Sequence, residues 1–331
     1  MLANVHNYFY FCKKVRRKSW NMQETNIEIQ SKTSVKCNSP KAWLLAARPK
    51  TLSGAAVPVM IGLALAYNDR LAYEDGGFNW IAALLCMLFA LIMQIDANFV
   101  NDFFDYAKGT DDIEKRLGPR RACAQGWVTV DKMKHAIAST TCLACLTGLP
   151  LVLYGGLEMI LIGLLCVVFC FLYTTHLSYV GLGDLLVVVF FGIVPVCTIY
   201  YIQFHTVTWI VFWASLACGI AIDALLIVNN FRDRDTDKEA GKNTLVVRIG
   251  AENSLRLYLA TGWTTYLIGI LYWADGHMLA FVLPTIYVVL HTFTYLKMKR
   301  INHGKALNLC LGETARNIFI YGATVTLGLL I

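Results

Sequence analysis

Charged residues are scarce in this chain. Aspartate, glutamate, lysine and arginine make up 15% of its 331 residues, whereas an ordinary soluble domain has about 25%. Hydrophobic residues make up 57%, and the mean hydropathy is +0.53. These values exclude an intrinsically disordered chain and are typical of a membrane protein.

The chain also lacks a disulfide framework, a nucleotide-binding P-loop and a histidine spacing suited to a metal. Most of its eleven cysteines lie in or at apolar runs, where cysteine packs as a small hydrophobic residue. Cys142 and Cys145 form a C-x-x-C pair, but no histidine or second pair accompanies them. The net charge of +7 comes from Lys and Arg spread between apolar runs, which indicates membrane topology rather than nucleic-acid binding.

Long apolar stretches predict about nine transmembrane helices in an all-α, polytopic membrane protein. They cover residues 52–67, 80–100, 135–153, 157–176, 184–203, 208–228, 257–274, 277–296 and 310–331. Helices of about 20 residues each would use nearly all of the hydrophobic residues. We therefore expect a single transmembrane domain over residues 41–331, after a basic, mobile tail over residues 1–40 to which we assign no function.

The positive charges predict the orientation. Of the 29 Lys and Arg residues, 27 lie before Leu52 or in the second, fourth, sixth and eighth loops. Because positive charges gather on the cytoplasmic side, we expect a cytoplasmic N-terminus. The long polar connections 101–134 and 229–256 then lie on the cytoplasmic side, where we expect the chemistry.

Two acidic motifs repeat at the ends of the second and sixth predicted spans. When the sequence is aligned with itself at an offset of 128 residues, Asn101 matches Asn229, Phe103 matches Phe231 and Asp105 matches Asp233. Helical spacing of about 100° per residue puts the polar residues of each motif on one face. The first face holds Gln94, Asn98, Asn101 and Asp105, and the second holds Asp223, Asn230, Asp233 and Asp237. Asp96 points away from the first face, and Asp235 from the second.

Two acidic faces at membrane depth would repel each other unless cations lay between them. Carboxylate and amide oxygens are ligands that suit Mg²⁺, which commonly bridges to a substrate phosphate. The sequence therefore predicts a diphosphate held by Mg²⁺ and by nearby basic residues. These are Lys108, Arg116, Arg120, Arg121, Arg232 and Lys242. A solvated helix end explains a single motif of this kind equally well, but two matched motifs favour a shared site.

Several short motifs resemble the UbiA-type intramembrane aromatic prenyltransferases, and more closely their branch acting on 1,4-dihydroxy-2-naphthoate in menaquinone synthesis. The resemblance covers about residues 41–331. Its specific pieces are R-P-K-T-L at 48–52, N-D-x-x-D at 101–105, R-L-G-P-R at 116–120, Tyr173-Thr174, G-L-G-D at 181–184, and 229–237 leading into G-K-N-T-L at 241–245.

The resemblance implies a helical bundle around a central cavity that opens to the lipid. It implies Mg²⁺ ligation by Asn101, Asp105, Asp233 and Asp237, with Asp111 and Asp102 as supporting candidates. Gly109 stands where some relatives carry a further Asp. The candidate substrate-binding residues are Arg48, Asn98, Asp102, Lys108, Arg116, Arg120, Arg232 and Lys242.

The implied reaction is transfer of a polyprenyl group from a diphosphate to 1,4-dihydroxy-2-naphthoate, with decarboxylation, giving demethylmenaquinone. Tyr173, with Phe103 or Tyr179, would stabilise the allylic cation, although plain packing explains such aromatic residues equally well. Asp184 would orient an acceptor hydroxyl or take its proton, unless it only caps a helix. The alternatives are transfer to homogentisate or 4-hydroxybenzoate, or a divalent-cation transporter. The resemblance points to a bacterial inner membrane, with the active site toward the cytoplasm.

Overall fold

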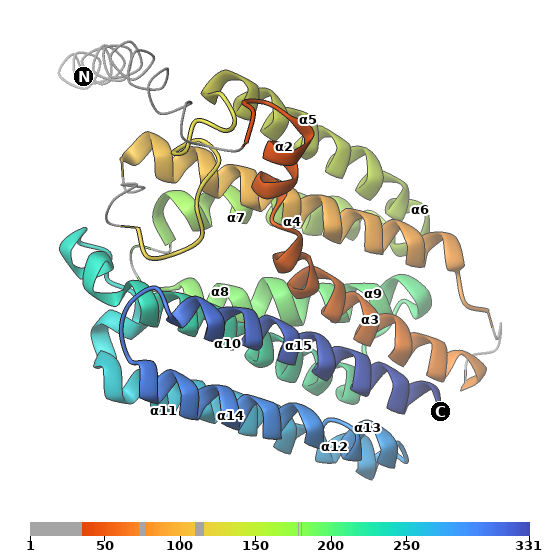
Figure 1. Cartoon of the computed structure of the whole chain (residues 1–331). Coiled ribbons are helices and arrows are strands. Elements are labelled where there is room, and N and C mark those ends of the chain that lie inside the picture. The colour runs from red at the N-terminus through yellow and green to blue at the C-terminus, as the bar shows by residue number, and fades with distance from the viewer. Residues whose placement is uncertain (1–34, 73–76, 110–115, 178, 180) are drawn as a thin grey trace, which may run out of the picture.

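A computed structural model describes residues 35–72, 77–109, 116–177, 179 and 181–331 (Figure 1). The secondary structure of these residues is helical, and none of them forms a strand. Most of the predicted N-terminal tail lies outside this range. Its last residues contact the domain, because Asn38 donates from its amide to the carbonyl of Trp127 at 2.7 Å. The prediction of an all-α protein is therefore confirmed over the described chain.

The N-terminal part of the domain consists of two long helices entered through a bend. Its elements are α2 Pro40–Ala47, η2 Pro49–Thr51, α3 Leu52–Asp69, η3 Arg70–Ala72 and α4 Trp80–Lys108. Arg48 adopts a left-handed conformation (φ 50°) that turns α2 into η2. Asn79 caps α4 by accepting from the amide of Ala82, and Gly109 ends it at φ 71°. The glycine found in place of a further Asp is thus the helix stop, since left-handed backbone favours glycine.

The remaining helices continue the bundle. They are α5 Val130–Gly148, η4 Leu149–Leu151, α6 Val152–Gly155, α7 Glu158–Leu172, the π-helical turn η5 Tyr173–Leu177, α8 Gly183–Val188, the π-helical turn η6 Val189–Ile193, α9 Val194–Phe204, α10 Trp209–Glu239, α11 Leu245–Ile268, α12 Ile270–Ala274, α13 Met278–Val282, α14 Thr285–Ile301 and α15 Leu307–Leu330. In Figure 1, α4 and α5 lie on one side of the bundle and α11 and α14 on the other, with α3, α10 and α15 between them.

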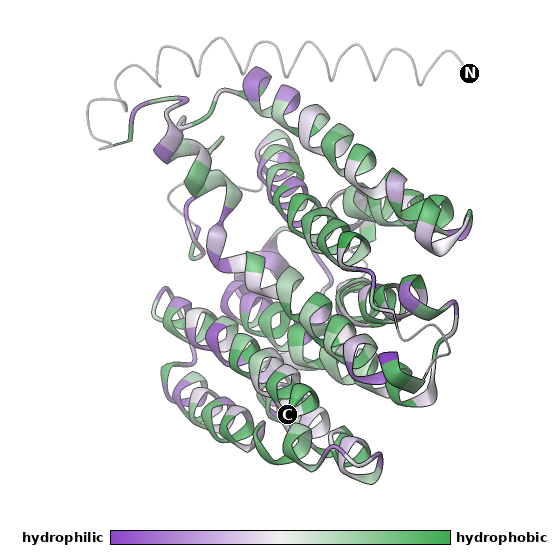
Figure 2. Ribbon diagram, turned by 90° about the vertical axis from the view of Figure 1, so that its right-hand side faces the viewer, coloured by the Kyte–Doolittle hydropathy of each residue, from purple (hydrophilic) through white to green (hydrophobic). Residues whose placement is uncertain are grey.

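Seven segments of the described chain are long and apolar enough to cross a membrane. They are Pro40–Ala72, Trp80–Lys108, Val130–Gly155, Glu158–Thr175, Gly183–Phe204, Trp209–Glu239 and Met278–Ile301. The predicted spans 257–274 and 310–331 are helical in α11, α12 and α15 but are not among the seven. Large apolar side chains such as Leu153, Leu157 and Leu161 are exposed, and Figure 2 shows hydrophobic residues along the outside of the helices. This surface suits lipid, and the chain is a multi-pass membrane protein.

Helix α10 is the central helix of the bundle. In the apolar part of α10, 61% of the residues are buried, whereas only 11% are buried in the peripheral span that contains α7. It packs on α3, α8, α9, α11 and α15. A close approach lies at Gly192 and Gly219, where a β-carbon on Gly192 would lie 2.5 Å from the Cα of Gly219. These two glycines therefore allow η6 to lie directly on α10.

We expect Gly219→Ala to separate η6 from α10 and to lower the free energy of unfolding. A β-carbon there would meet the carbonyl oxygen of Val188 at 2.5 Å, and overpacking of this kind costs about 1–3 kcal/mol. Thermal unfolding of the purified protein in detergent measures the change. Gly163→Ala is the matched control, because no atom lies within 4 Å of its β-carbon position. Equal melting temperatures for the two variants would contradict the close-contact assignment.

Candidate active site

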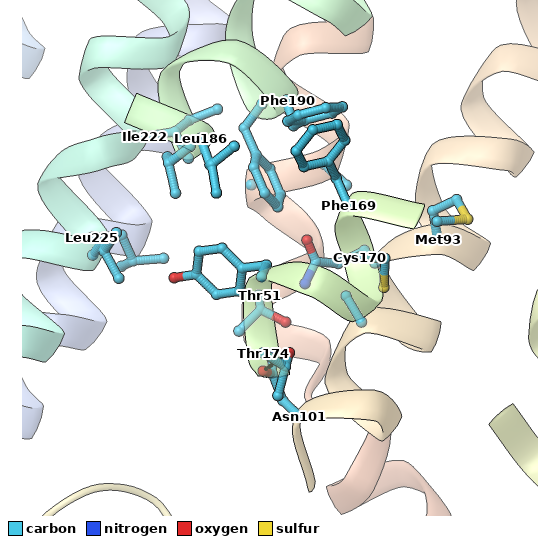
Figure 3. A pocket seen from close by; sticks show the side chains of 18 of the residues that line it. Thr51, Met93, Asn101, Phe169, Cys170, Thr174, Leu186, Phe190, Ile222 and Leu225 are labelled. Atoms are coloured by element: carbon cyan, nitrogen blue, oxygen red, sulfur yellow. Dashed lines mark hydrogen bonds between the residues drawn. The ribbon is translucent and has the colours of Figure 1, made fainter. Parts of the chain in front are cut away.

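A cavity of about 1270 Å³ runs through the bundle between α4 and α10. Both helices pack on α3 and α9, which hold them apart. Along α4 the lining extends from Cys86 to Asp105, and a helix rises roughly 28 Å over this distance. In Figure 3, Asn101 and Thr174 lie at one end, and Phe169, Phe190, Leu186 and Ile222 lie toward the other. The cavity therefore has a polar end and a long apolar portion.

The two acidic motifs meet at the polar end. Helices α4 and α10 both continue through their motifs, so that Asn101, Asp105, Asn229, Asp233 and Asp237 all line the cavity. Lys242 forms an ion pair with Asp237 at 3.6 Å and also interacts electrostatically with Asp105. Because Lys108 at the end of α4 and Lys242 after α10 both lie near the ring of Tyr179, the helix ends lie close together across the cavity.

Residues at the end of α4 bond to other segments that surround the polar end. Asn101 accepts from the hydroxyl of Thr174 at 2.6 Å, and Asp105 accepts from Arg121 at 2.9 Å. Lys108 donates to the carbonyls of Thr174 and Thr175. Its ammonium lies 4.2 Å from the ring centroid of Tyr179, while Lys242 lies 5.9 Å from the same ring. Tyr179 thus lies near lysines associated with both motifs.

Asn98 and Asp102, two residues of α4 that the sequence predicts to bind substrate, bond to other parts of the protein. The Asp102 carboxylate accepts from the amides of Ala122 and Cys123, each at 2.8 Å, and lies 3.6 Å from Arg48. The Asn98 amide donates to the carbonyl of Ala47 and the hydroxyl of Thr51, each at 2.9 Å. Neither lines the cavity. Their hydrogen bonds link Asp102 to the connection after α4 and Asn98 to the bend before α3.

Asp96 and Phe103 also lie away from the cavity. Asp96 is buried and accepts from the hydroxyls of Thr140 and Thr141 on α5. This explains an intramembrane carboxylate on the face of α4 opposite the motif. Phe103 packs in the hydrophobic cluster formed by α2, α4 and the 122–137 segment, and it does not line the cavity. Asp111 lies outside the described residues.

Arg232 forms hydrogen bonds to residues of the second motif. It is 2% exposed and donates to both carboxylate oxygens of Asp233, at 2.8 and 2.5 Å. It also donates to the side-chain carbonyls of Asn229 and Asn308. Arg232 does not line the cavity, so the structure places it as a support for Asp233 and Asn229 rather than as a direct substrate contact.

The segment 116–121 brings further positive charge to the polar end. Arg116, Arg120 and Arg121 line the cavity there. Asn308 at the start of α15 holds this segment by donating to the carbonyl of Leu117 at 2.8 Å. A β-carbon on Gly118 would lie 2.5 Å from Arg232, so the segment packs directly on that guanidinium. Burial lowers the pKa of Arg116, and the neighbouring charge of Arg48 lowers it further. This crowding of cations suits an anionic ligand.

Deeper along the cavity lie Tyr173 and Asp184. Tyr173 begins the π-helical turn after α7, and a β-carbon on Gly183, the residue before Asp184, would lie 3.7 Å from its hydroxyl. Asp184 lies in the first turn of α8 but makes no side-chain capping bond. Its carboxylate bonds to its own backbone amide, so both the helix-end role and the acceptor-binding role predicted for Asp184 stay open.

The polar end fits Mg²⁺ shared with a diphosphate. The described residues contain no group of three or more His, Cys, Asp or Glu side chains arranged to hold a metal. Mg²⁺, however, is usually held by one or two carboxylates together with substrate phosphate and water. Asp237 leaves its buried Oδ2 without a hydrogen-bond partner, and Asp105, Asp233 and two asparagine amides lie on the same cavity. This oxygen set suits a hard cation that arrives with a phosphate.

Sequence reasoning missed Asn308. It lies near the start of α15, far from both motifs in the chain, and joins Arg232 to Leu117. Only its position as a polar residue at a predicted span end distinguishes it in the sequence. Arg121 was included among the nearby charges, but its ion pair with Asp105 at 2.9 Å was not foreseen.

An apolar cavity with carboxylates and cations at one end suits a lipid that carries an anionic head group. Residues 55–312 match the UbiA prenyltransferase family. The chain belongs to this family and is a membrane-embedded prenyltransferase.

Relatives with known names support this membership. The chain is 37% identical over 235 residues to a 1,4-dihydroxy-2-naphthoate octaprenyltransferase of Escherichia coli K12, covering 68% of this chain and 74% of the relative. It is 35% identical to the enzyme of the same name from Mycobacterium tuberculosis, covering 65% and 72%. A UbiA prenyltransferase domain-containing protein 1 homolog of Drosophila melanogaster is 28% identical, covering 85% and 77%.

Solved structures share the fold. A UbiA homolog from Aeropyrum pernix K1 has a TM-score of 0.63 at 15% identity, covering 83% of this chain and 97% of that one. A UbiA homolog from Archaeoglobus fulgidus bound to DMAPP and Mg²⁺ has a TM-score of 0.56 at 15% identity, covering 86% and 98%. The helical arrangement described above is therefore the UbiA fold.

Asp102 and Asp105 of α4 test the assignment of one side chain to a buried contact and of the other to the cavity. We expect Asp102→Asn to lower thermal stability, because the Ala122 and Cys123 amides bond to different oxygens of the carboxylate and Asn offers only one, and a lost buried hydrogen bond costs about 1–3 kcal/mol. We expect Asp105→Asn to lower the melting temperature less, because the Asn side-chain oxygen can still accept from Arg121. Thermal unfolding of both variants measures the difference. A larger loss of stability in Asp105→Asn than in Asp102→Asn would contradict these assignments.

Proposed function

We propose that this protein transfers a polyprenyl group from polyprenyl diphosphate to 1,4-dihydroxy-2-naphthoate, with decarboxylation, to give demethylmenaquinone. The observation that carries the proposal is the meeting of two acidic motifs at the polar end of a long apolar cavity. The names of the 35–37% identical relatives favour the naphthoate acceptor over homogentisate or 4-hydroxybenzoate.

The diphosphate would bind at the polar end. Asn101, Asp105, Asp233 and Asp237 would hold Mg²⁺, which when bound neutralises negative charge on the departing diphosphate. Arg116, Arg120 and Lys242 line the same end and would contact the diphosphate oxygens directly. Arg232 would keep Asp233 and Asn229 in place, and Lys108 would fix the turn that carries Thr174. Charges placed in advance in a water-poor site favour departure of the diphosphate.

The polyprenyl chain would lie in the apolar portion of the cavity. Phe169 and Phe190, with ring centroids 4.7 Å apart, line it beyond Tyr173, and Figure 3 shows them at the end away from Asn101. Tyr173 lines the cavity next to Gly183 and Asp184, and its ring would face the allylic cation. The apolar lining would exclude water from this cation. It also argues against a divalent-cation transporter, because an ion path requires polar groups through the full membrane depth.

The topology follows the charges of the sequence. We propose that the helical segments 257–274 and 310–331 also cross the membrane, which gives nine spans and a cytoplasmic N-terminus. The polar end of the cavity would then face the cytoplasm of a bacterial inner membrane, where a water-soluble diphosphate leaves readily.

Product analysis tests the proposed reaction. Membranes containing the protein are incubated with Mg²⁺, a labelled polyprenyl diphosphate and one of three acceptors: 1,4-dihydroxy-2-naphthoate, homogentisate or 4-hydroxybenzoate. We expect mass spectrometry to detect prenylated, decarboxylated product with the naphthoate, and chelation of divalent metal to abolish its formation. Prenylation of another acceptor alone would overturn the acceptor assignment, and metal flux without any prenylated product would overturn the enzyme.

Substitution of the motif aspartates tests the polar end. We expect Asp105→Asn and Asp233→Asn to lower kcat by at least about 100-fold, because each removes a charge that the diphosphate site requires. Asp235→Asn is the matched control, since this neighbour of Asp233 is exposed and pairs with His303 at 3.4 Å. Steady-state kinetics on protein that elutes as the wild type does by size exclusion measures the effect. Near-normal turnover in either motif variant would contradict the diphosphate site.

A further inference from the structure

We propose that Asp184 and Asp223 together form the subsite that recognises a hydroxyl group of the aromatic acceptor. Asp184 would contact the acceptor, and Asp223 would position Asp184 from the neighbouring helix. This inference rests on the proposed function and deepens it, because it assigns the acceptor to one wall of the cavity and adds a residue that the motifs do not explain.

Both carboxylates are buried and incompletely bonded. Asp184 is 8% exposed and Asp223 is 6% exposed. Each leaves its buried Oδ1 without a hydrogen-bond partner. Neither forms an ion pair with a Lys, Arg or His among the residues that the structure describes. Buried polar oxygens of this kind are costly unless a ligand or water satisfies them.

The two residues lie on helices that pack against each other. Helix α8 packs on α10, and a β-carbon on Gly183 would lie 3.3 Å from Leu226, less than one turn after Asp223. The same position lies 3.6 Å from the ring of Tyr173. Asp184 and Asp223 interact electrostatically with each other, and Tyr173 interacts with both. Asp184 lines the cavity, so the pair lies beside the place assigned to the allylic carbon.

The chemistry of the pair differs from that of the polar end. The unpartnered oxygens of Asp184 and Asp223 are hydrogen-bond acceptors, and a hydroxyl group of the acceptor would supply the donor that they lack. A diphosphate carries only acceptors and excess negative charge, and it is matched by the cations around Arg116 and Lys242 instead. The two ends of the site therefore select different substrates.

Asp96 shows how a purely structural carboxylate is satisfied in the same protein. It is fully buried in a spanning helix, yet both of its oxygens accept from threonine hydroxyls of α5. No side-chain hydroxyl bonds to the free Oδ1 of Asp184 or of Asp223 in the described structure. This contrast indicates that a ligand, rather than another side chain, supplies the missing hydrogen bonds of Asp184 and Asp223.

Separate saturation of the two substrates tests the pair. We expect Asp223→Asn and Asp184→Asn each to raise KM for 1,4-dihydroxy-2-naphthoate at least about tenfold, with KM for polyprenyl diphosphate changed less than about twofold. Because the residues act as a unit, the double variant should raise the acceptor KM little beyond the single variants. Asp223→Glu keeps the carboxyl group and should recover part of the acceptor affinity. A merely structural role would produce none of this asymmetry.

Asp96→Asn is the matched control, since it removes an equally buried membrane carboxylate away from the cavity, and both of its KM values should equal those of the wild type. Binding of the naphthoate to the protein in lipid nanodiscs, followed by its own fluorescence, gives a readout that does not need turnover. Unchanged acceptor KM and acceptor binding in folded Asp223→Asn would overturn this inference. The proposed function would still stand if the wild type formed prenylated product. Equal changes in both substrates would likewise overturn the inference, and a wild type without prenylated product would reject both proposals.

Discussion

The carboxylates that end α4 and α10 impose the main constraint on this structure. Each motif places negative charge at the end of a spanning helix, and the two ends lie close enough for Lys242 to act on both. That arrangement is stable only with compensating cations. The protein provides them from separate parts of the chain: Arg121 for Asp105, Arg232 for Asp233 and Lys242 for Asp237. A magnesium diphosphate would enter a site whose carboxylates are already electrostatically balanced by these cations.

The remaining architecture keeps this polar end in place while leaving an apolar path beside it. Asp102, Asn98 and Arg232 are buried and bonded to the backbone or to other side chains, so they fix the loops and helix ends from outside the cavity. The contact of Gly192 with Gly219 brings the α8–α9 segment onto α10, and that contact sets the wall on which Asp184 lies. Long lipid substrates need the apolar portion, whereas the charged leaving group needs the polar end.

The sequence predicted the features that depend on local order. Apolar runs located the helices, and helical periodicity placed Gln94, Asn101, Asp105, Asp233 and Asp237 on the cavity. Partners distant in the sequence were not predictable. Asp102 turns toward Ala122 and Cys123, and Asn98 toward Ala47 and Thr51, because tertiary contacts compete with the cavity for each polar side chain. The part played by Asn308 in joining Arg232 to the 116–121 segment has no local signal at all.

The most direct test of the account is an experimental structure of the protein with Mn²⁺ in place of Mg²⁺ and a polyprenyl thiodiphosphate that reacts slowly. We predict metal density between the Asp105 side chain and the Asp233 and Asp237 side chains, bridged by the diphosphate, with the prenyl chain running past Tyr173 toward Phe169 and Phe190. Diphosphate bound elsewhere, or motif carboxylates still paired only with Arg121, Arg232 and Lys242 in the presence of both ligands, would contradict the account.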